Sequence, residues 1–148
     1  MPDHPSAVVV FDIDGTVADC RHRRHHIDKE APDWETFFAG SEIDDPLAEG
    51  VALAFEHAAD GHLVWLTGRP ERYRRITVAW LQALGLPATV LHMRHDDDMR
   101  PAAVFKTERL AQIAASQEIL LVVDDDDLVV AALREAGWPV EHAQWMKR

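Results

Sequence analysis

The sequence is poor in cysteine, since Cys20 is the only one among 148 residues. A framework of intrachain disulfides is therefore excluded, and a reducing compartment such as the cytoplasm is the expected location. Long apolar runs are missing too, because none approaches the roughly 20 residues that a membrane-spanning helix needs. The first six residues lack the basic and apolar regions of a signal peptide. We therefore expect a cytoplasmic protein with no membrane contact.

Positive charge is scarce as well. Lys and Arg number 15 against 26 Asp and Glu, which gives a formal net charge of −11. This balance disfavours broad, non-specific binding to nucleic acid, although it allows a local basic site. A chain of 148 residues can bury one core. No repeat, low-complexity linker or domain boundary is visible, so we expect a single domain over residues 1–148.

The rest of the chain is organised around residues 7–16. Residues 7–11 are apolar and rich in Val, which predicts a buried strand of a parallel sheet. Asp12 and Asp14 follow this strand, and Gly15 permits a sharp turn directly after them. Sites in α/β folds lie at the carboxyl ends of strands. Because paired buried charges are costly, we expect a divalent cation here; the alternative is an Asp-Gly turn without a ligand.

Strand-like and helix-like segments alternate along the chain, which predicts an α/β fold with a mostly parallel sheet flanked by helices. Further strands are expected at residues 63–66, 89–91, 119–123 and 139–141. Helices are expected to begin near residue 34 with Asp33 as N-cap and to span about 45–59 and 71–84. A further helix is expected to begin near residue 102, and another to follow the acids at 124–127 and end near residue 135. Only two short helices are expected between residues 16 and 63, so the site has a minimal cap or none.

Polar side chains follow two more of the predicted strands. Thr67, Gly68 and Arg69 combine a hydroxyl, backbone N–H groups and a guanidinium, which together can bind a phosphate. A plain strand-to-helix turn capped by Thr67 is the alternative. Asp124 and Asp125 follow the strand at residues 119–123. Since the carboxyl ends of parallel strands meet at one edge, we expect all of these groups to share one crevice.

Two basic features belong to the same crevice. Residues 21–26, Arg-His-Arg-Arg-His-His, follow the Asp14 turn closely and favour an electropositive flap for an anionic substrate. A solvated loop is the alternative, and the histidines do not complete a zinc site. Lys106 lies near a helix start, where the helix dipole disfavours a cation, which indicates a role in the site. A surface lysine is the alternative there.

These residue types are suited to phosphoryl transfer. A carboxylate can attack phosphorus and form an aspartyl-phosphate, and a second carboxyl can protonate the leaving oxygen and then activate water. Both reactants are negative, so a hard cation such as Mg²⁺ must bridge them. A hydroxyl, backbone amides and a Lys can neutralise the transferring group, and Lys106 should also hold the carboxylates.

This set resembles the haloacid dehalogenase superfamily of phosphohydrolases over nearly the whole chain. The signature Asp-x-Asp-Gly-Thr matches residues 12–16, and the other three motifs follow in the family's order. Those three motifs match Thr67, Lys106, and the pair Asp124 and Asp125. The resemblance implies a Rossmann-like fold, with Asp12 as nucleophile, Asp14 as general acid and base, and Thr67 and Lys106 binding the phosphoryl group.

The resemblance also implies which groups hold Mg²⁺. They are Asp12, the backbone carbonyl of Asp14, Asp124 and Asp125. Asp126 and Asp127 are not part of the family pattern, so which two of these four consecutive acids bind the ion is open.

Within the superfamily, the chain is most similar to the 3′-phosphatase domain of bacteriophage-type polynucleotide kinase. Arg23 fits the Arg that follows the signature, and Thr67-Gly68-Arg69 stands where that family has Ser-Gly-Arg. The resemblance implies that Arg23, Gly68 and Arg69 bind the substrate. The kinase half of that family is absent from this sequence, so a separate kinase or ligase partner is left open.

We therefore expect a Mg²⁺-dependent phosphatase for the 3′-phosphate of nucleic-acid ends or nucleotides, because an open site suits a polymer end. The alternatives are a small-molecule phosphatase or nucleotidase and, from another class, a non-catalytic phosphate-binding module. A basic groove with stacking aromatics would favour the polymer, whereas a closed pocket capped by Trp34 and Phe37 would favour a small substrate.

Overall fold

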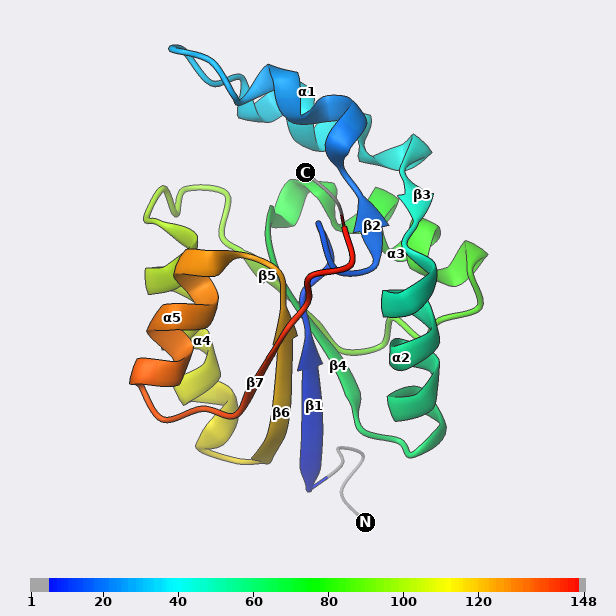
Figure 1. Ribbon diagram of the computed structural model, residues 1–148, viewed down its shortest axis with the longest axis vertical. Coiled ribbons are helices and arrows are strands. Elements are labelled where there is room, and N and C mark those ends of the chain that lie inside the picture. The colour runs from blue at the N-terminus through cyan, green and yellow to red at the C-terminus, as the bar shows by residue number, and fades with distance from the viewer. Residues whose placement is uncertain (1–5, 147–148) are drawn as a thin grey trace.

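The computed structural model describes residues 6–146, and their main feature is a five-stranded sheet in the order β5-β4-β1-β6-β7. Every neighbouring pair in this sheet is parallel. The strands are β1 (Ala7–Phe11), β4 (Leu63–Pro70), β5 (Leu91–Arg94), β6 (Glu118–Asp124) and β7 (Val140–His142). The predicted α/β fold with a mostly parallel sheet is confirmed (Figure 1).

Helices cover both faces of the sheet (Figure 1). One face carries α2 (Ala48–Ala59) and α3 (Arg74–Ala83), and the other carries α4 (Ala102–Ala114) and α5 (Asp127–Glu135). Successive side chains of a strand point to opposite faces, so β1 contributes side chains to the apolar clusters on both faces of the sheet. Val9 and Phe11 pack with α2 and α3, while Val8 and Val10 pack with α4 and α5. None of the helices in residues 6–146 has the length and apolar content to cross a bilayer.

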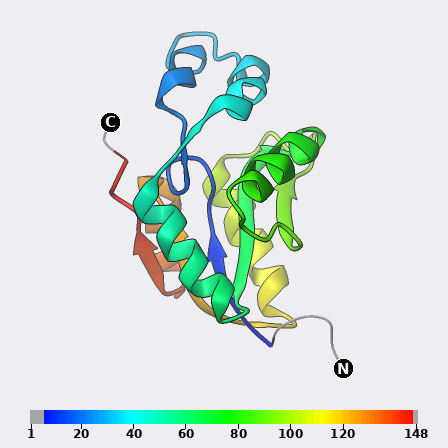
Figure 2. The same ribbon diagram turned by 90° about the vertical axis from the view of Figure 1, so that its right-hand side faces the viewer.

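A small cap stands beyond the carboxyl ends of the strands (Figure 2). Its stem is an antiparallel pair of two-residue strands, β2 (Ala18–Asp19) and β3 (Asp45–Pro46). The short helices η1 (Arg21–His26), α1 (Trp34–Ala39) and η2 (Gly40–Ile43) lie between these strands. They pack around an apolar cluster made of Cys20, Phe37, Phe38, Leu47 and Met146. A minimal cap is thus what the chain has.

The structure corrects three predicted boundaries. Residues 45–46 do not open a helix, because they pair with β2, and α2 begins only at Ala48. β4 does not stop before Thr67 but continues through Pro70, whose Cα pairs with Arg94 of β5 after a register shift. β5 starts and ends later than the strand expected at residues 89–91, since it spans Leu91–Arg94. The predicted N-cap of α1 is confirmed, since the Asp33 carboxylate accepts the Thr36 N–H.

Candidate active site

The carboxyl ends of β1, β4 and β6 face a cavity of about 640 Å³ between the sheet and the cap. Of the residues predicted from sequence to form the site, Asp12, Asp14, Gly68, Lys106, Asp124 and Asp125 line this cavity. Thr67, Arg23 and Arg69 are buried around it, each with only 1% of its surface exposed. The cap contributes Trp34, Phe37 and Phe38 to the opposite wall.

Asp12 comes directly after β1 and is almost completely buried. Its Oδ1 accepts a hydrogen bond from Lys106 Nζ at 2.7 Å, and its Oδ2 accepts one from the Thr16 hydroxyl at 3.0 Å. Burial, together with the nearby Asp125, raises the pKa of Asp12 to about 8 in spite of Lys106. Thr16, the last residue of the signature, therefore orients the Asp12 carboxylate.

Lys106 reaches the sheet edge from the first turns of α4. Its Nζ donates to Asp12 Oδ1 at 2.7 Å and to Asp124 Oδ2 at 2.6 Å, so it bridges the ends of β1 and β6. Burial works against a charged lysine, but the two carboxylates outweigh it and raise the pKa of Lys106. The expectation that Lys106 holds the carboxylates is confirmed by these contacts.

Asp12, Asp124 and Asp125 form a cluster that fits a cation. One carboxylate oxygen from each lies within 4.8 Å of the others. Burial and the charge of Asp12 raise the pKa of Asp124 to about 6, because the buried acids carry more negative charge than Lys106 offsets. Hard carboxylate oxygens are the ligands that Mg²⁺ prefers. The residues present therefore fit the ion that the sequence implied.

Gly15 makes this cluster sterically possible. Its φ is +84°, a conformation that glycine adopts without strain. A Cβ atom at this position would lie 2.0 Å from Asp125 Oδ2. The glycine of the signature is thus required by the turn and also by the approach of Asp125.

Asp126 and Asp127 have other contacts. The Asp126 carboxylate caps α5, since its Oδ1 accepts the N–H groups of Leu128 at 2.9 Å and Val129 at 3.1 Å. The Asp127 side chain is 82% exposed and lies 3.0 Å from His142 Nε2. Of the four consecutive acids, the first two therefore belong to the cluster with Asp12, and the last two belong to the start of α5.

Asp14 has a different set of partners. Arg69 donates from Nη2 to Asp14 Oδ1 at 2.7 Å and from Nε to Oδ2 at 3.1 Å, and Arg23 Nη2 donates to Oδ1 at 2.5 Å. Burial opposes the charge of Asp14, but Arg69 and Arg23 outweigh it and hold the pKa of this carboxyl well below its usual range. Asp14 is therefore ionised in this arrangement, and its arginine partners make it a weak base.

Arg23 is held by Asp44, a residue that was not predicted from the sequence. Arg23 donates from Nε at 2.8 Å and from Nη2 at 2.6 Å to the Asp44 carboxylate, whose side chain is fully buried. The Trp80 indole N–H donates to the Asp44 carbonyl at 2.9 Å. The guanidinium of Arg23 is therefore engaged inside the cap, and its predicted contact with substrate stays a prediction. Nothing in the sequence distinguishes Asp44 from the exposed Asp45 beside it.

The predicted phosphate-binding turn is the last part of β4. The Thr67 hydroxyl accepts the N–H of Arg69 at 3.1 Å, and Arg69 Nη1 donates to the Thr77 hydroxyl at 3.0 Å. Gly68 lines the cavity, and its carbonyl accepts a hydrogen bond from Arg94 Nε at 3.0 Å. The predicted phosphoryl contact of Thr67 and the substrate contacts of Gly68 and Arg69 stay predictions.

Comparison with known proteins decides the family. The model of the polynucleotide kinase PNKP phosphatase domain matches residues 5–144. This chain belongs to that family. It is therefore a phosphatase of the haloacid dehalogenase type, and the resemblance seen in the sequence is confirmed. Comparison with curated protein sequences gives no match.

Solved structures agree with the fold. Two structures of a Pnkp1/Rnl/Hen1 complex, one described as an RNA repair complex, match with TM-scores of 0.75 and 0.78 at 22% and 21% identity. They match over 95% and 96% of this chain but only 44% and 47% of theirs, so the chain spans less than half of those proteins. The class C acid phosphatase from Bacillus anthracis matches with a TM-score of 0.67 at 13% identity, over 88% of this chain and 61% of its own.

Proposed function

We propose that this PNKP-type phosphatase depends on Mg²⁺ and removes the 3′-phosphate from nucleic-acid ends or nucleotides, through an aspartyl-phosphate on Asp12. The main support is the arrangement at Asp12, where Lys106 orients the carboxylate beside Asp124 and Asp125. A single buried nucleophile, held next to a group of hard oxygen ligands, is what phosphoryl transfer to a carboxylate needs.

The residues divide the chemistry between them. Mg²⁺ held by Asp12, Asp124 and Asp125 would supply the positive charge that offsets the phosphoryl oxygens. Asp12 attacks phosphorus, while Thr16 and Lys106 fix its orientation. Lys106 and the N–H groups in the last part of β4 offset charge on the transferring group.

Asp14 is proposed as the general acid and base. Its two arginine partners keep it ionised, which is the form needed to take a proton from the water that hydrolyses the aspartyl-phosphate, but they also make it a weak base. In the first step Asp14 must carry the proton for the leaving oxygen. The negative charge of a phosphoryl group bound beside Asp14 would disfavour its ionised form and so raise its pKa toward protonation.

A nucleotidase, or another small-molecule phosphatase, is the second candidate. It is favoured by the cap, because Trp34 and Phe37 close one wall of the cavity. The family match favours the nucleic-acid end.

A separate kinase or ligase partner is also part of the proposal, supported by the RNA repair complex among the similar structures. A single domain over residues 1–148 and a cytoplasmic location complete it.

The test is phosphate release with Mg²⁺ from a 3′-phosphorylated oligonucleotide, its 5′-phosphorylated twin and a set of mononucleotides, in DNA and RNA form. We expect the 3′-end to be preferred, and we expect EDTA to stop the reaction and added Mg²⁺ to restore it. Preference for mononucleotides would identify the nucleotidase. Turnover without any divalent ion would contradict the proposed metal site.

A further inference from the structure

The transfer of a phosphoryl group does not require the aromatic wall of the cavity. Trp34, Phe37 and Phe38 of α1 line the same space as Asp12 and Asp14. Phe37 and Phe38 are buried, whereas Trp34 is 47% exposed. A large aromatic surface left open inside an enzyme cavity is suited to a flat, apolar part of the ligand.

We propose that Trp34 is the stacking platform for the nucleobase of the nucleotide that carries the scissile phosphate. This inference rests on the proposed function, and it names the part of the substrate that the cap recognises. It assigns the cap a binding role, while the sheet edge carries the chemistry.

The indole of Trp34 is held in place before any ligand arrives. Its ring stacks on Phe38 at a centroid distance of 5.8 Å and an interplanar angle of 24°, and it meets Phe37 edge-on at 5.8 Å and 85°. Phe38 in turn contacts the Tyr73 ring at 5.5 Å. Such a supported ring loses little conformational freedom on binding, so stacking on it is efficient.

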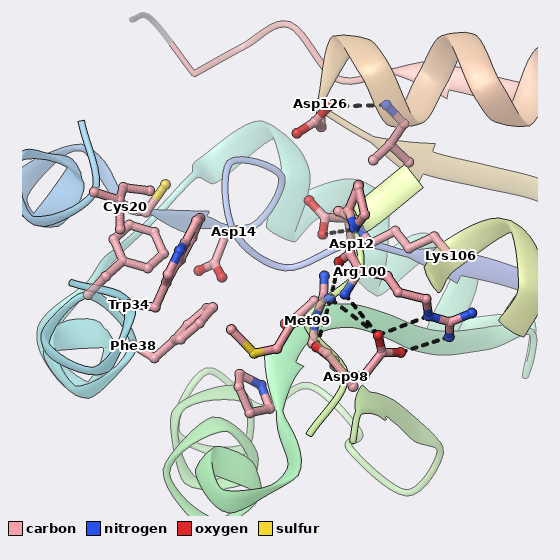
Figure 3. A pocket seen from close by; sticks show the side chains of 18 of the residues that line it. Asp12, Asp14, Cys20, Trp34, Phe38, Asp98, Met99, Arg100, Lys106 and Asp126 are labelled. Carbon is pink, nitrogen blue, oxygen red and sulfur yellow. Dashed lines mark hydrogen bonds and ion pairs between the residues drawn. The ribbon is translucent and has the colours of Figure 1, made fainter. Parts of the chain in front are cut away.

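The loop before α4 also offers apolar surface to this cavity. Met99, in the loop before α4, lines the cavity and is 82% exposed. Figure 3 shows Trp34, Phe38 and Met99 gathered on the side of the cavity where Asp14 lies. A flat base between Trp34 and the flexible Met99 side chain would bring its attached phosphate toward the Asp12 end of the cavity.

The charges of the cavity favour stacking over contacts along a phosphate backbone. Among the described residues that line it, the acids outnumber the bases. The basic groups at its rim are already paired, since Arg72 contacts Glu35, and Arg100 contacts Asp98 at 2.8 Å and Glu108 at 2.5 Å. Proteins that follow a nucleic-acid backbone use an open basic groove, which this cavity lacks. We therefore infer that one terminal nucleotide supplies most of the binding.

The test compares kcat/KM on two oligonucleotides with a 3′-phosphate that differ only in the terminal base, one intact and one abasic. Trp34→Ala is expected to lower kcat/KM on the intact end by about 10- to 100-fold and to leave the abasic end nearly unchanged. Trp34→Phe should restore most of the loss. Ile43→Ala, which changes a 77% exposed residue of the cap outside the cavity, is the matched control and should change neither. An equal loss on both ends, or no loss, would overturn the role of Trp34.

Binding supplies a second readout. In the inactive Asp12→Asn background, calorimetry with a 3′-phosphorylated decanucleotide, which is long enough to make several phosphate contacts, should show the same loss of affinity for Trp34→Ala. The affinity should fall less than tenfold between 50 and 200 mM salt, against the roughly 10³-fold or greater fall expected for several phosphate contacts. A steep dependence on salt would show that backbone phosphates, and not the base, hold the substrate.

Failure of this inference and failure of the proposed function are distinguishable. If the enzyme preferred 5′-phosphates, the proposed 3′-specificity would fail, yet the intact and abasic comparison would still measure the role of Trp34. If a phosphotyrosine peptide were hydrolysed faster than any nucleotide and depended on Trp34, the platform would serve another aromatic ring. That result would overturn the assignment to a nucleobase.

Discussion

Asp12 and Asp14 are two residues apart, yet their surroundings are opposite. Asp12 lies among other carboxylates with Lys106 as its cationic partner, and burial raises its pKa to about 8. Asp14 lies between Arg23 and Arg69, which outweigh burial and lower its pKa. The same residue type is thus prepared for two different tasks by the elements that surround it.

Two regions follow from this contrast, and their charges differ. The Asp12 region consists of Asp12, Asp124, Asp125 and Lys106, and the Asp14 region consists of Asp14, Asp44, Arg23 and Arg69. In the first, the buried acids exceed the base, whereas in the second, acids and bases are equal in number. Unbalanced buried charge is costly unless a cation joins it, while a balanced set needs none. The imbalance therefore makes the Asp12 region the one that fits a cation, and the balanced set connects the cap to the sheet edge.

The largest effect is expected from Asp12→Asn, which breaks the Asp12 region. Turnover should fall on the order of 10⁴-fold or more, because the variant removes the nucleophile. The fold should remain, since the change also relieves repulsion among buried acids. Steady-state phosphate release and thermal unfolding measure the two effects. Retained activity would remove the aspartyl-phosphate mechanism.

The same variant tests the pH dependence of stability in EDTA. With its pKa raised to about 8, Asp12 binds a proton in the folded state at pH values where the unfolded chain has lost it. The free energy of unfolding of the metal-free protein should therefore fall as the pH rises from about 4 to about 8. Asp12→Asn should flatten this fall, and an unchanged slope would contradict the assignment to Asp12.

The next effect concerns the four consecutive acids. Asp124→Asn should weaken Mg²⁺ binding by more than the roughly 10- to 100-fold that results from losing a residue that only orients a ligand. Asp126→Asn is the matched control, because it removes an equal charge and Asn caps a helix as well as Asp. Mg²⁺ titrations of activity and of thermal stability measure both variants. Equal losses would mean that total charge, and not ligation, sets the affinity.

A smaller effect is expected from Asp44→Asn, which breaks the Asp14 region. Removing one partner of a buried ion pair costs about 3–5 kcal/mol of stability, because it leaves Arg23 undercompensated. Asp28→Asn removes the exposed partner of Arg24 and should cost less than about 1 kcal/mol. Urea unfolding measures both costs. Mg²⁺ affinity should stay the same in both variants, and a large loss in Asp44→Asn would contradict the separation of the two regions.

The Asp12 region could be predicted from the sequence because its signals are local. An apolar run followed by acids predicts a buried strand that ends in carboxylates, and the alternation of elements places those ends together. Lys106 was identified by its position at a helix start. These residues lie at the ends of elements that a sequence pattern can locate, so their convergence follows from the fold class.

Of the Asp14 region, Asp14, Arg23 and Arg69 were named from the sequence, but Asp44 and the contacts among the four residues could not be predicted in the same way. Arg23 is one of three arginines in residues 21–24, and only the packing of the cap decides that it points inward. Asp44 is buried because residues 45–46 pair with β2, where a helix was expected from Asp45 and Pro46. Both outcomes depend on contacts between segments that are distant in sequence, which local patterns do not encode.

The smallest expected effect concerns Cys20, a buried residue of the cap that belongs to neither region. Burial, together with the charge of Asp14, raises the pKa of the Cys20 thiol to about 12, which lowers its thiolate fraction on the order of 10³-fold at neutral pH. Labelling of native Cys20 by a thiol reagent should therefore be slow and should require local opening of the cap. Asp44→Asn should speed the labelling, because it loosens the cap, whereas saturating Mg²⁺ should change the rate less than about twofold. A marked slowing by Mg²⁺ would mean that the Asp12 region and the cap open together. The Asp12 and Asp14 regions would then not be independent.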